Sequence, residues 1–356
     1  MQEIPIVLIG HMRKIFIYLS LFFIILIVIA GFKIEQGRKE TPGLSNEPVV
    51  VKVGYFPNIT HARAVVGIVN GDFQEVLGKD VIIKVRTFNA GPSEIEALFV
   101  GEIDIGYIGP SPAINGYIKS NGEALRIIGG AASGGASLVV QPDLALAFEK
   151  EGIRAFIGKK IASPQQGNTQ DISLRHYLKE NNLSDKTLIV PIANADQLTM
   201  FALKQLDGAW APEPWASRLI KEAGGIRLID ERELWPDKGF CTANIIVRTK
   251  FLEQHPELVQ KWLQAHIEIT EWINTHPEEA KNIVNSEIEK LTTKKLPDNV
   301  LSEAWQMLSF TVDPLKSSVL TFADWAYSQG FLGEKEPDLT NLYDLKILNE
   351  VTNTKY

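Results

Sequence analysis

From Val49 onward, short runs rich in β-branched residues alternate with segments of helical periodicity, and this alternation constrains the fold more than any other feature. Strand, helix and strand in succession make the unit that builds parallel sheets flanked by helices. The pattern predicts strands at residues 49–54, 81–86, 103–108 and 125–128, with amphipathic helices between them. These elements would form a first α/β lobe.

A second lobe is predicted to begin after the β-rich run at residues 137–140. Strands are expected at residues 159–162 and 188–191, and helices at 171–179 and 195–206. Another β-rich run covers residues 243–247, and the chain after it is predicted to be almost wholly helical. If those helices pack back on the first lobe, the chain crosses between lobes twice, near Ser137 and near Ala243. We therefore expect two α/β lobes, each a mostly parallel sheet flanked by helices, with two hinge strands; lobe 1 comprises residues 49–137 and 243–356, and lobe 2 residues 138–242.

The N-terminus has the pattern of a membrane-targeting segment. Residues 15–32 carry no charged side chain and follow directly on Arg13 and Lys14. This stretch is longer than a usual cleaved signal core and close to the lower limit for a membrane-spanning helix. We expect residues 1–34 to be a signal or signal-anchor segment, with residues 15–32 as the anchor, and residues 35–48 to be a linker. Cleavage after Ala30 is the alternative. Because the positively charged flank stays inside the cell, we expect the chain that follows the segment to be exported.

Composition excludes several classes of function. The chain has 43 acidic and 36 basic residues, a net charge of −7, which disfavours non-specific binding to nucleic acid. Its single cysteine, Cys241, cannot form an intramolecular disulfide, and its six histidines form no pair with metal-ligand spacing. The chain contains no Gly-x-Ser-x-Gly elbow, no phosphate-binding loop of the Walker type and no zincin pair. We therefore expect no metal, no cofactor and no enzymatic activity.

Candidate ligand contacts of the first lobe lie in loops that follow strands. In open α/β sheets, ligands bind beyond the carboxyl ends of the strands, where helix N-termini present N–H groups. The loops at residues 55–61, 88–93 and 106–112 fit this position, although helix capping or turn formation alone would also explain their residues. The candidates are Asn58, Thr60, His61, Asn89, Gly91, Gly109, Pro110, Ser111 and Ser133. His61 and Arg63 are the two candidates for a charged contact, and either could instead be solvated.

In the second lobe, two segments stand out. Residues 163–170 join a strand to a helix, and a glycine followed by small polar residues is typical of an anion-binding helix start or of a plain cap. In residues 210–215, two indoles flank a double-proline turn and could form a rigid apolar wall with N–H donors, or could pack in the core. The candidates here are Gly167, Asn168, Thr169, Gln170, Trp210 and Glu213.

Several segments together resemble the substrate-binding proteins of the aliphatic sulfonate, nitrate and taurine class of ABC importers. They are VGYFPNITHA at residues 53–62, EALFVGEIDIGY at 96–107 with GPSP at 109–112, and QLDGAW at 205–210 with PEPW at 212–215. The resemblance covers about residues 49–277. It implies the type-two periplasmic binding fold, a ligand in the cleft between the lobes, and permease and ATPase subunits as partners.

Two departures from this class matter. Lipid-anchored members carry a cysteine at the end of the signal, which this chain lacks, and the related thiamine-pyrimidine enzymes carry a cysteine-rich motif, whereas Cys241 stands alone. We therefore expect an extracytoplasmic, monomeric solute-binding protein for a small anion. An organic sulfonate is favoured because two tryptophans offer an apolar wall that nitrate cannot use. Nitrate, bicarbonate or taurine binding, a sensory lobe and a thiamine-pyrimidine type of enzyme are the alternatives.

Overall fold

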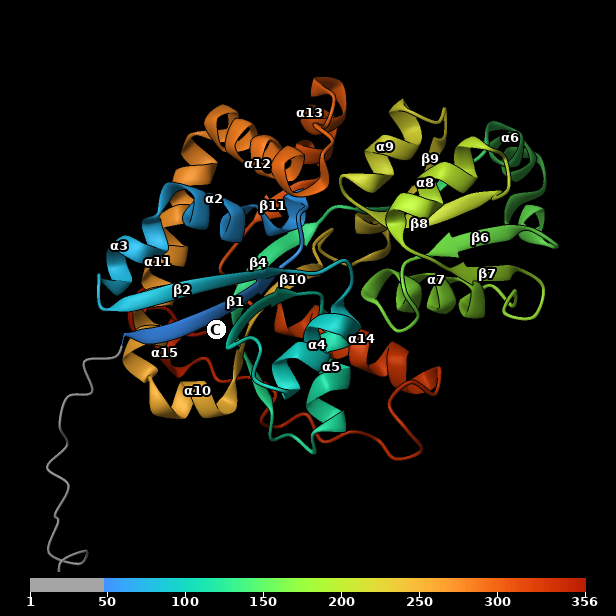
Figure 1. Cartoon of the computed structure of the whole chain (residues 1–356). Coiled ribbons are helices and arrows are strands. Elements are labelled where there is room, and N and C mark those ends of the chain that lie inside the picture. Colours follow the sequence, from blue (N-terminus) through green and yellow to red (C-terminus); the bar gives the residue numbers. More distant parts are fainter. Residues whose placement is uncertain (1–47) are drawn as a thin grey trace, which may run out of the picture. The chain divides into compact units, whose positions relative to one another are not determined.

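Two β-sheets organise residues 48–356, the part of the chain that the computed structural model describes (Figure 1). The expected membrane segment and almost all of the expected linker lie outside these described residues. Within residues 48–356, none of the helices combines the length and the apolar character needed to cross a membrane. The prediction of a two-sheet α/β fold is confirmed.

The first sheet has six strands, in the order β11-β4-β10-β3-β1-β2. Strand β1 is parallel to both β2 and β3, whereas β10 is antiparallel to β3 and β4. The four strands predicted for the first lobe are present, with ends shifted by a few residues, whereas β11 lies in a region predicted to be helical. The bounds are β1 (Val49–Tyr55), β2 (Val81–Thr87), β3 (Ile105–Ile108), β4 (Leu125–Gly134), β10 (Cys241–Arg248) and β11 (Leu308–Phe310).

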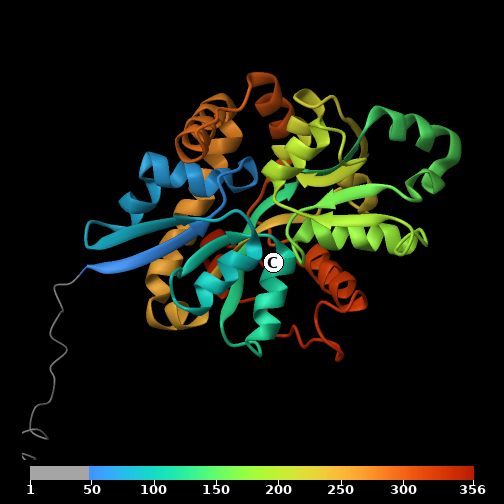
Figure 2. The ribbon, with the colours of Figure 1, turned by 45° about the vertical axis from the view of Figure 1, so that its right-hand side comes forward.

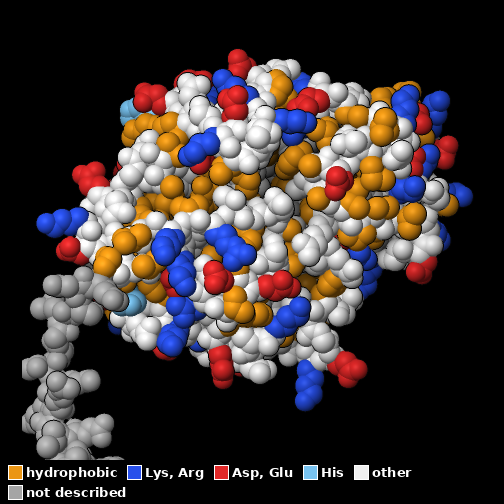
Figure 3. All heavy atoms as spheres, in the orientation of Figure 1, with side chains coloured by type: hydrophobic (Ala, Val, Ile, Leu, Met, Phe, Trp, Pro, Cys, Tyr) orange, Lys and Arg blue, Asp and Glu red, His pale blue; other side chains and the backbone are white. Residues whose placement is uncertain are grey.

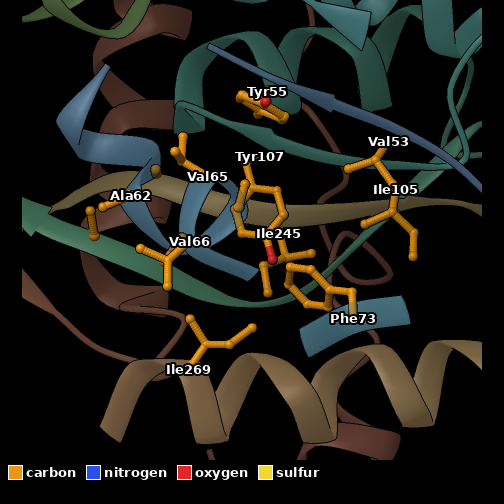
Figure 4. Close-up of a cluster of buried hydrophobic side chains, with 14 of the residues drawn as sticks. Val53, Tyr55, Ala62, Val65, Val66, Phe73, Ile105, Tyr107, Ile245 and Ile269 are labelled. Atoms are coloured by element: carbon orange, nitrogen blue, oxygen red, sulfur yellow. The ribbon is translucent and has the colours of Figure 1, made fainter. Parts of the chain in front are cut away.

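Helices cover both faces of this sheet, and together they form the first lobe. Successive side chains of a strand point to opposite faces of the sheet, so a separate hydrophobic core lies on each face. Ile245 of β10 belongs to one core and Ile246 to the other. Figure 4 shows part of the first core, where Tyr107 and Ile245 meet Val66 and Ile269 from flanking helices. The helices are η1 (Ile59–His61), α2 (Ala62–Asn70), α3 (Asp72–Leu77), α4 (Gly91–Phe99), α5 (Pro110–Lys119), α10 (Thr249–Gln254), α11 (Pro256–Thr275), α12 (Pro277–Thr292), α13 (Asp298–Gln306), α14 (Lys316–Ser328) and α15 (Lys346–Thr352).

The second sheet has five strands, in the order β7-β6-β8-β5-β9, and with its helices it forms the second lobe (Figure 2). Strand β6 is parallel to β7 and β8, and β5 is antiparallel to β8 and β9. The strands are β5 (Ala136–Val140), β6 (Lys160–Ser163), β7 (Leu188–Pro191), β8 (Gly208–Pro212) and β9 (Ile226–Asp230). The helices are α6 (Pro142–Glu151), η2 (Gly152–Phe156), α7 (Thr169–Glu180), α8 (Asn194–Ala202), α9 (Trp215–Lys221) and η3 (Glu231–Leu234).

The chain crosses between the sheets at two adjacent points. One crossing is Gly134–Gly135, which joins β4 to β5 with φ angles of +74° and +72°, a region where glycine is favoured. The other is the segment between η3 and β10. The Gly134 N–H donates to the Phe240 carbonyl at 3.0 Å, and Thr242 Oγ1 donates to the Gly134 carbonyl. The two crossings are therefore bonded to each other.

The C-terminal helices pack on the first lobe, as predicted, and two of them also contact the second lobe. Helix α13 lies against α9, and α14 lies against α7. The His176 ring of α7 is stacked on Trp325 of α14, with centroids 3.9 Å apart. Lys179 Nζ also donates to the Ser328 carbonyl at 2.8 Å. Two bridges therefore link the lobes in addition to the crossings.

Candidate functional site

Helices α2 and α5 begin after β1 and β3, and α2 continues directly from η1, with the Ala62 N–H donating to the Ile59 carbonyl. Their first turns consist of Ala62 to Val65 and Pro110 to Ala113, with no acidic residue in either. No side chain of the described residues caps these two helices. Because the first N–H groups of a helix carry partial positive charge, both starts suit an anion better than a cation.

The loop before α2 contributes neutral polar groups. Thr60 Oγ1 donates to Asn58 Oδ1 at 2.5 Å, so these two candidates bond to each other instead of capping the helix. The Phe56 N–H donates to His61 Nδ1 at 3.0 Å, and the Phe56 and His61 rings are stacked with centroids 4.5 Å apart. Burial lowers the pKa of His61 to about 3, so its imidazole is neutral and carries its proton on Nε2. His61 can therefore act as a neutral donor.

Two glycines of the first lobe make room for the second lobe. A Cβ on Gly91 would clash with the Pro112 ring and would lie 3.3 Å from Asn168 Oδ1. A Cβ on Gly109 would clash with Thr169 Oγ1. These candidates from the two lobes are therefore close together. Asn89 stands beside them but is exposed.

Ser111 and Thr169 lie at one of the contacts between the two lobes. The Ser111 N–H lies 3.4 Å from Thr169 Oγ1, so the starts of α5 and α7 face each other. Ser111 Oγ is buried and has no hydrogen-bond partner within residues 48–356. A buried hydroxyl without a partner is costly, and a ligand oxygen between the lobes would satisfy it. Pro110 opens α5 beside it.

The loop before α7 is organised by its own carboxylate. Asp171 accepts hydrogen bonds from the Gly167 N–H at 3.0 Å, from Ser163 Oγ at 2.6 Å and from Arg175 Nε at 2.9 Å. The Gly167 N–H is therefore engaged within the loop, which agrees with the capping alternative at that position. The next three candidates, Asn168, Thr169 and Gln170, are buried around the helix start.

Trp210 does not form a wall of the site. It lies in β8, a central strand of the second sheet, and is 0% exposed within the core that contains Leu138 and Ile161. Its indole N–H donates to Glu231 Oε2 at 2.6 Å. The sequence suggested a double-proline turn, but strand pairing on both sides directs this side chain into the lobe. The core-packing alternative therefore describes Trp210.

Glu213 and Ser133 lie near the crossings. Glu213 is buried, accepts the Ser217 N–H at 2.9 Å and pairs with Arg227 Nη2 at 3.2 Å. Burial raises the pKa of Glu213 to about 7. Both carboxylate oxygens are thus engaged with protein groups, as expected for a structural residue. Ser133 lies at the end of β4, paired with Cys241 of β10 and Ser309 of β11.

Arg63, a candidate for a charged contact, is buried and only 1% exposed, so the alternative of a solvated side chain is wrong. Its Nη1 donates to the carbonyls of Thr311 at 2.8 Å and Gly130 at 3.3 Å, and lies 2.9 Å from His266 Nε2. One signal could have found it, because positions 59, 63 and 66 share a helical face whose other two members, Ile59 and Val66, are core residues.

On the face shown in Figure 3, acidic and basic side chains are interspersed, so this face offers nucleic acid no continuous basic surface. Among the described residues, His, Cys, Asp and Glu side chains form no cluster of three that could hold a metal ion.

Two α/β lobes joined by two bonded crossings, with helix starts of both lobes meeting between them, define the type-two periplasmic binding fold. Among solved structures, the alkanesulfonate-binding protein SsuA from Xanthomonas axonopodis pv. citri, bound to MOPS, has a TM-score of 0.65 at 19% identity, covering 81% of this chain and 96% of that chain. The nitrate-binding protein NrtA from Synechocystis PCC 6803 has a TM-score of 0.70 at 15% identity, covering 86% of this chain and 89% of that chain. Residues 45–287 match the model of the NMT1-like family, and the chain belongs to this family.

Curated relatives are binding proteins. A putative binding protein of Brucella abortus is 28% identical over 56% of this chain, and the match spans 59% of that relative's length. A putative aliphatic sulfonates-binding protein of Bacillus subtilis is 25% identical over 77% of this chain and 80% of that protein. The taurine-binding periplasmic protein of Escherichia coli is 27% identical over 51% of this chain and 55% of that protein.

Proposed function

We propose that this chain is the solute-binding component of an ABC importer and binds a small anion, an organic sulfonate foremost, between its two lobes. It works outside the cytoplasm as a monomer, held to the membrane by residues 15–32, and delivers its ligand to permease and ATPase subunits. It is a binding protein and not an enzyme. The observation that carries this proposal is the meeting of Ser111, with its unpartnered buried hydroxyl, and Thr169 across the lobes.

The polar groups around this meeting point favour an anion. The starts of α2 and α5 carry positive partial charge, His61 is a neutral donor, and Ser111 Oγ has no partner within residues 48–356. Ligand contacts are proposed from both lobes, since a ligand that touches only one of them gives the cleft no reason to close. The contacts are Asn58, Thr60, His61, Asn89, Gly91, Gly109, Pro110, Ser111 and Ser133 from the first lobe, and Asn168, Thr169 and Gln170 from the second.

A sulfonate is favoured over nitrate by the relatives, because the Bacillus subtilis protein is named for aliphatic sulfonates and the Xanthomonas protein was solved with MOPS, which carries a sulfonate group. Taurine, itself a sulfonate, is the second candidate, on the name of the Escherichia coli relative. Trp210 does not contribute to this choice, since it is a core residue.

A thermal-shift panel tests the proposal. The purified chain is melted with ethanesulfonate, longer alkanesulfonates, taurine, nitrate and bicarbonate, each at several concentrations. A ligand at 100 times its dissociation constant adds about 2.7 kcal/mol of stability, which is a readily measured increase in Tm. Sulfonates should give the largest increases. A panel in which none of these anions raises Tm above a matched chloride control would refute anion binding.

A further inference from the structure

Arg63 is a buried guanidinium whose Nη1 end is fixed by protein groups. Nη1 contacts the carbonyls of Gly130 and Thr311 and lies 2.9 Å from His266 Nε2. His266 Nε2 also lies 3.0 Å from the Gly130 carbonyl, and its Nδ1 lies 3.1 Å from Tyr107 Oη, so both ring nitrogens have protein partners. Burial and the nearby Arg63 hold the pKa of His266 well below its usual value, which keeps the ring neutral. These partners orient the guanidinium.

The other edge of the same guanidinium has no partner. Nε and Nη2 are both buried and make no hydrogen bond within residues 48–356, and no carboxylate of these residues pairs with Arg63. Nε–H and Nη2–H point in the same direction and form the two-pronged edge that binds two oxygens of a carboxylate or another oxyanion. Burial lowers the pKa of Arg63 only to about 9, so the group stays cationic at neutral pH. A buried, unpaired cation is strongly unfavourable unless an anion pairs with it.

The location of Arg63 connects this edge to the proposed site. It lies in the first turn of α2, two residues after His61. The Gly130 carbonyl that holds it belongs to β4, the strand that continues to Ser133 and the first crossing. The Phe310 ring of the adjacent β11 lies 5.6 Å from the guanidinium carbon. The guanidinium therefore lies among α2, β4 and β11 of the first lobe.

We propose that Arg63 is the anion receptor of the first lobe, and that its Nε–Nη2 edge pairs with two oxygens of the ligand's oxyanion head group. The inference rests on the proposed function, because it names the residue that recognises the anion there. It selects sulfonates, sulfate and carboxylates, which offer two oxygens side by side, over halides. Arg63 thus adds one charged contact to the neutral donors.

The role of Arg63 is tested with the variant Arg63→Lys, which keeps the positive charge but loses the planar two-pronged edge. Calorimetry measures the affinity of the full chain for ethanesulfonate. Affinity should fall about 10- to 100-fold, the loss expected for a hydrogen bond to a charged group. The control is Arg126→Lys, because Arg126 also lies in the first lobe and bonds to carbonyls of its own loop. It should bind ethanesulfonate as the wild type does. Equal affinity of Arg63→Lys and the wild type would overturn the assignment.

A spectroscopic readout separates direct contact from a structural effect and does not need a folded variant. The Nε–H resonance of Arg63, assigned in the ¹⁵N-labelled wild-type chain, should shift on addition of ethanesulfonate and not on addition of chloride. Binding of ethanesulfonate with an unshifted Nε–H resonance would overturn the receptor and leave the proposed function intact. Absence of binding to every anion tested would instead remove the proposed function, and the receptor with it.

Discussion

Arg227 of the second lobe and Glu303 of the first lobe form an ion pair, with Nη2 3.1 Å from Oε1. The same Arg227 nitrogen lies 3.2 Å from Glu213, and Lys221 Nζ lies 2.6 Å from the other oxygen of Glu303. Glu303 is therefore paired with two cations of the opposite lobe. Because α13 contributes the acid and α9 and β9 contribute the bases, separation of these elements would break both pairs.

Removing this bridge should favour the open arrangement of the lobes. We expect Glu303→Gln to weaken anion binding by about two- to fivefold, since partly exposed ion pairs contribute up to about 1 kcal/mol. Small-angle scattering should show a larger radius of gyration without ligand. Glu222→Gln is the matched control, because it breaks a partly exposed pair with Arg218 within one helix of the second lobe. Similar effects of both variants would contradict a bridging role.

The buried Glu94 should make stability depend on pH. Its two carboxyl oxygens have no partner within residues 48–356, and burial raises its pKa well above 4.5. As pH rises above the unfolded pKa of about 4.3, the unfolded state loses this proton first. The free energy of unfolding then falls by up to about 1.4 kcal/mol per pH unit until the folded pKa is reached.

Urea unfolding of the wild type and Glu94→Gln at pH 5 and pH 8 measures this effect. The variant cannot ionise, so we expect it to lose less stability than the wild type between the two values. Glu96→Gln is the control, because Glu96 is exposed on the same helix. If Glu94→Gln and the wild type lose the same free energy, Glu94 does not carry the dependence.

Trp210→Phe should lower stability without changing ligand preference. The variant leaves Glu231 Oε2 without its indole donor, and an unsatisfied buried acceptor costs about 1–3 kcal/mol. Chemical unfolding measures the loss, and calorimetry with alkanesulfonates of increasing length measures preference. A selective loss of affinity for the longest chains would return Trp210 to the ligand pocket.

Gly109→Ala should prevent the lobes from approaching as closely as they do here. The backbone of Gly109 has a φ of −67°, which alanine adopts without strain, so the added Cβ acts through its clash with Thr169 Oγ1. We expect anion affinity to fall about tenfold or more while Tm without ligand changes little. Adding Thr169→Ala should restore part of the affinity. Gly129→Ala, whose Cβ would meet ordinary contacts from 3.6 Å, is the control.

The sequence predicted those parts of the molecule that depend on local pattern. Strands β1, β2 and β3 coincide with runs that the β-branched pattern predicted. Strand β8 was missed because its residues, Gly-Ala-Trp-Ala-Pro, include no β-branched side chain and precede a turn rich in proline. Strand β11 has three residues, too few for any periodicity.

The candidate site also has features that a local sequence pattern indicates and features that depend on tertiary packing. Loops after β1 and β3 could be identified as candidate ligand-binding positions because helix starts follow strands in the sequence. The burial of Glu94 could not be predicted, since it depends on strands distant in the sequence against which its carboxyl packs. Glu94 reads as an ordinary acid in the first turn of a helix, yet in the fold its carboxyl lies above Gly54 and Gly106, two paired glycines of adjacent strands.

The bond between Gly134 and Phe240 fixes how the lobes can turn. Two crossings that are bonded to each other leave a single axis of rotation, which passes close to them. In a rotation, displacement grows with distance from the axis, so Ser133 should move little on ligand binding. Helix α6, at the end of the second lobe farthest from β4 and β10 in Figures 1 and 2, travels along the longest arc. A probe attached to α6 would therefore report the largest displacement, even for a closure of a few degrees.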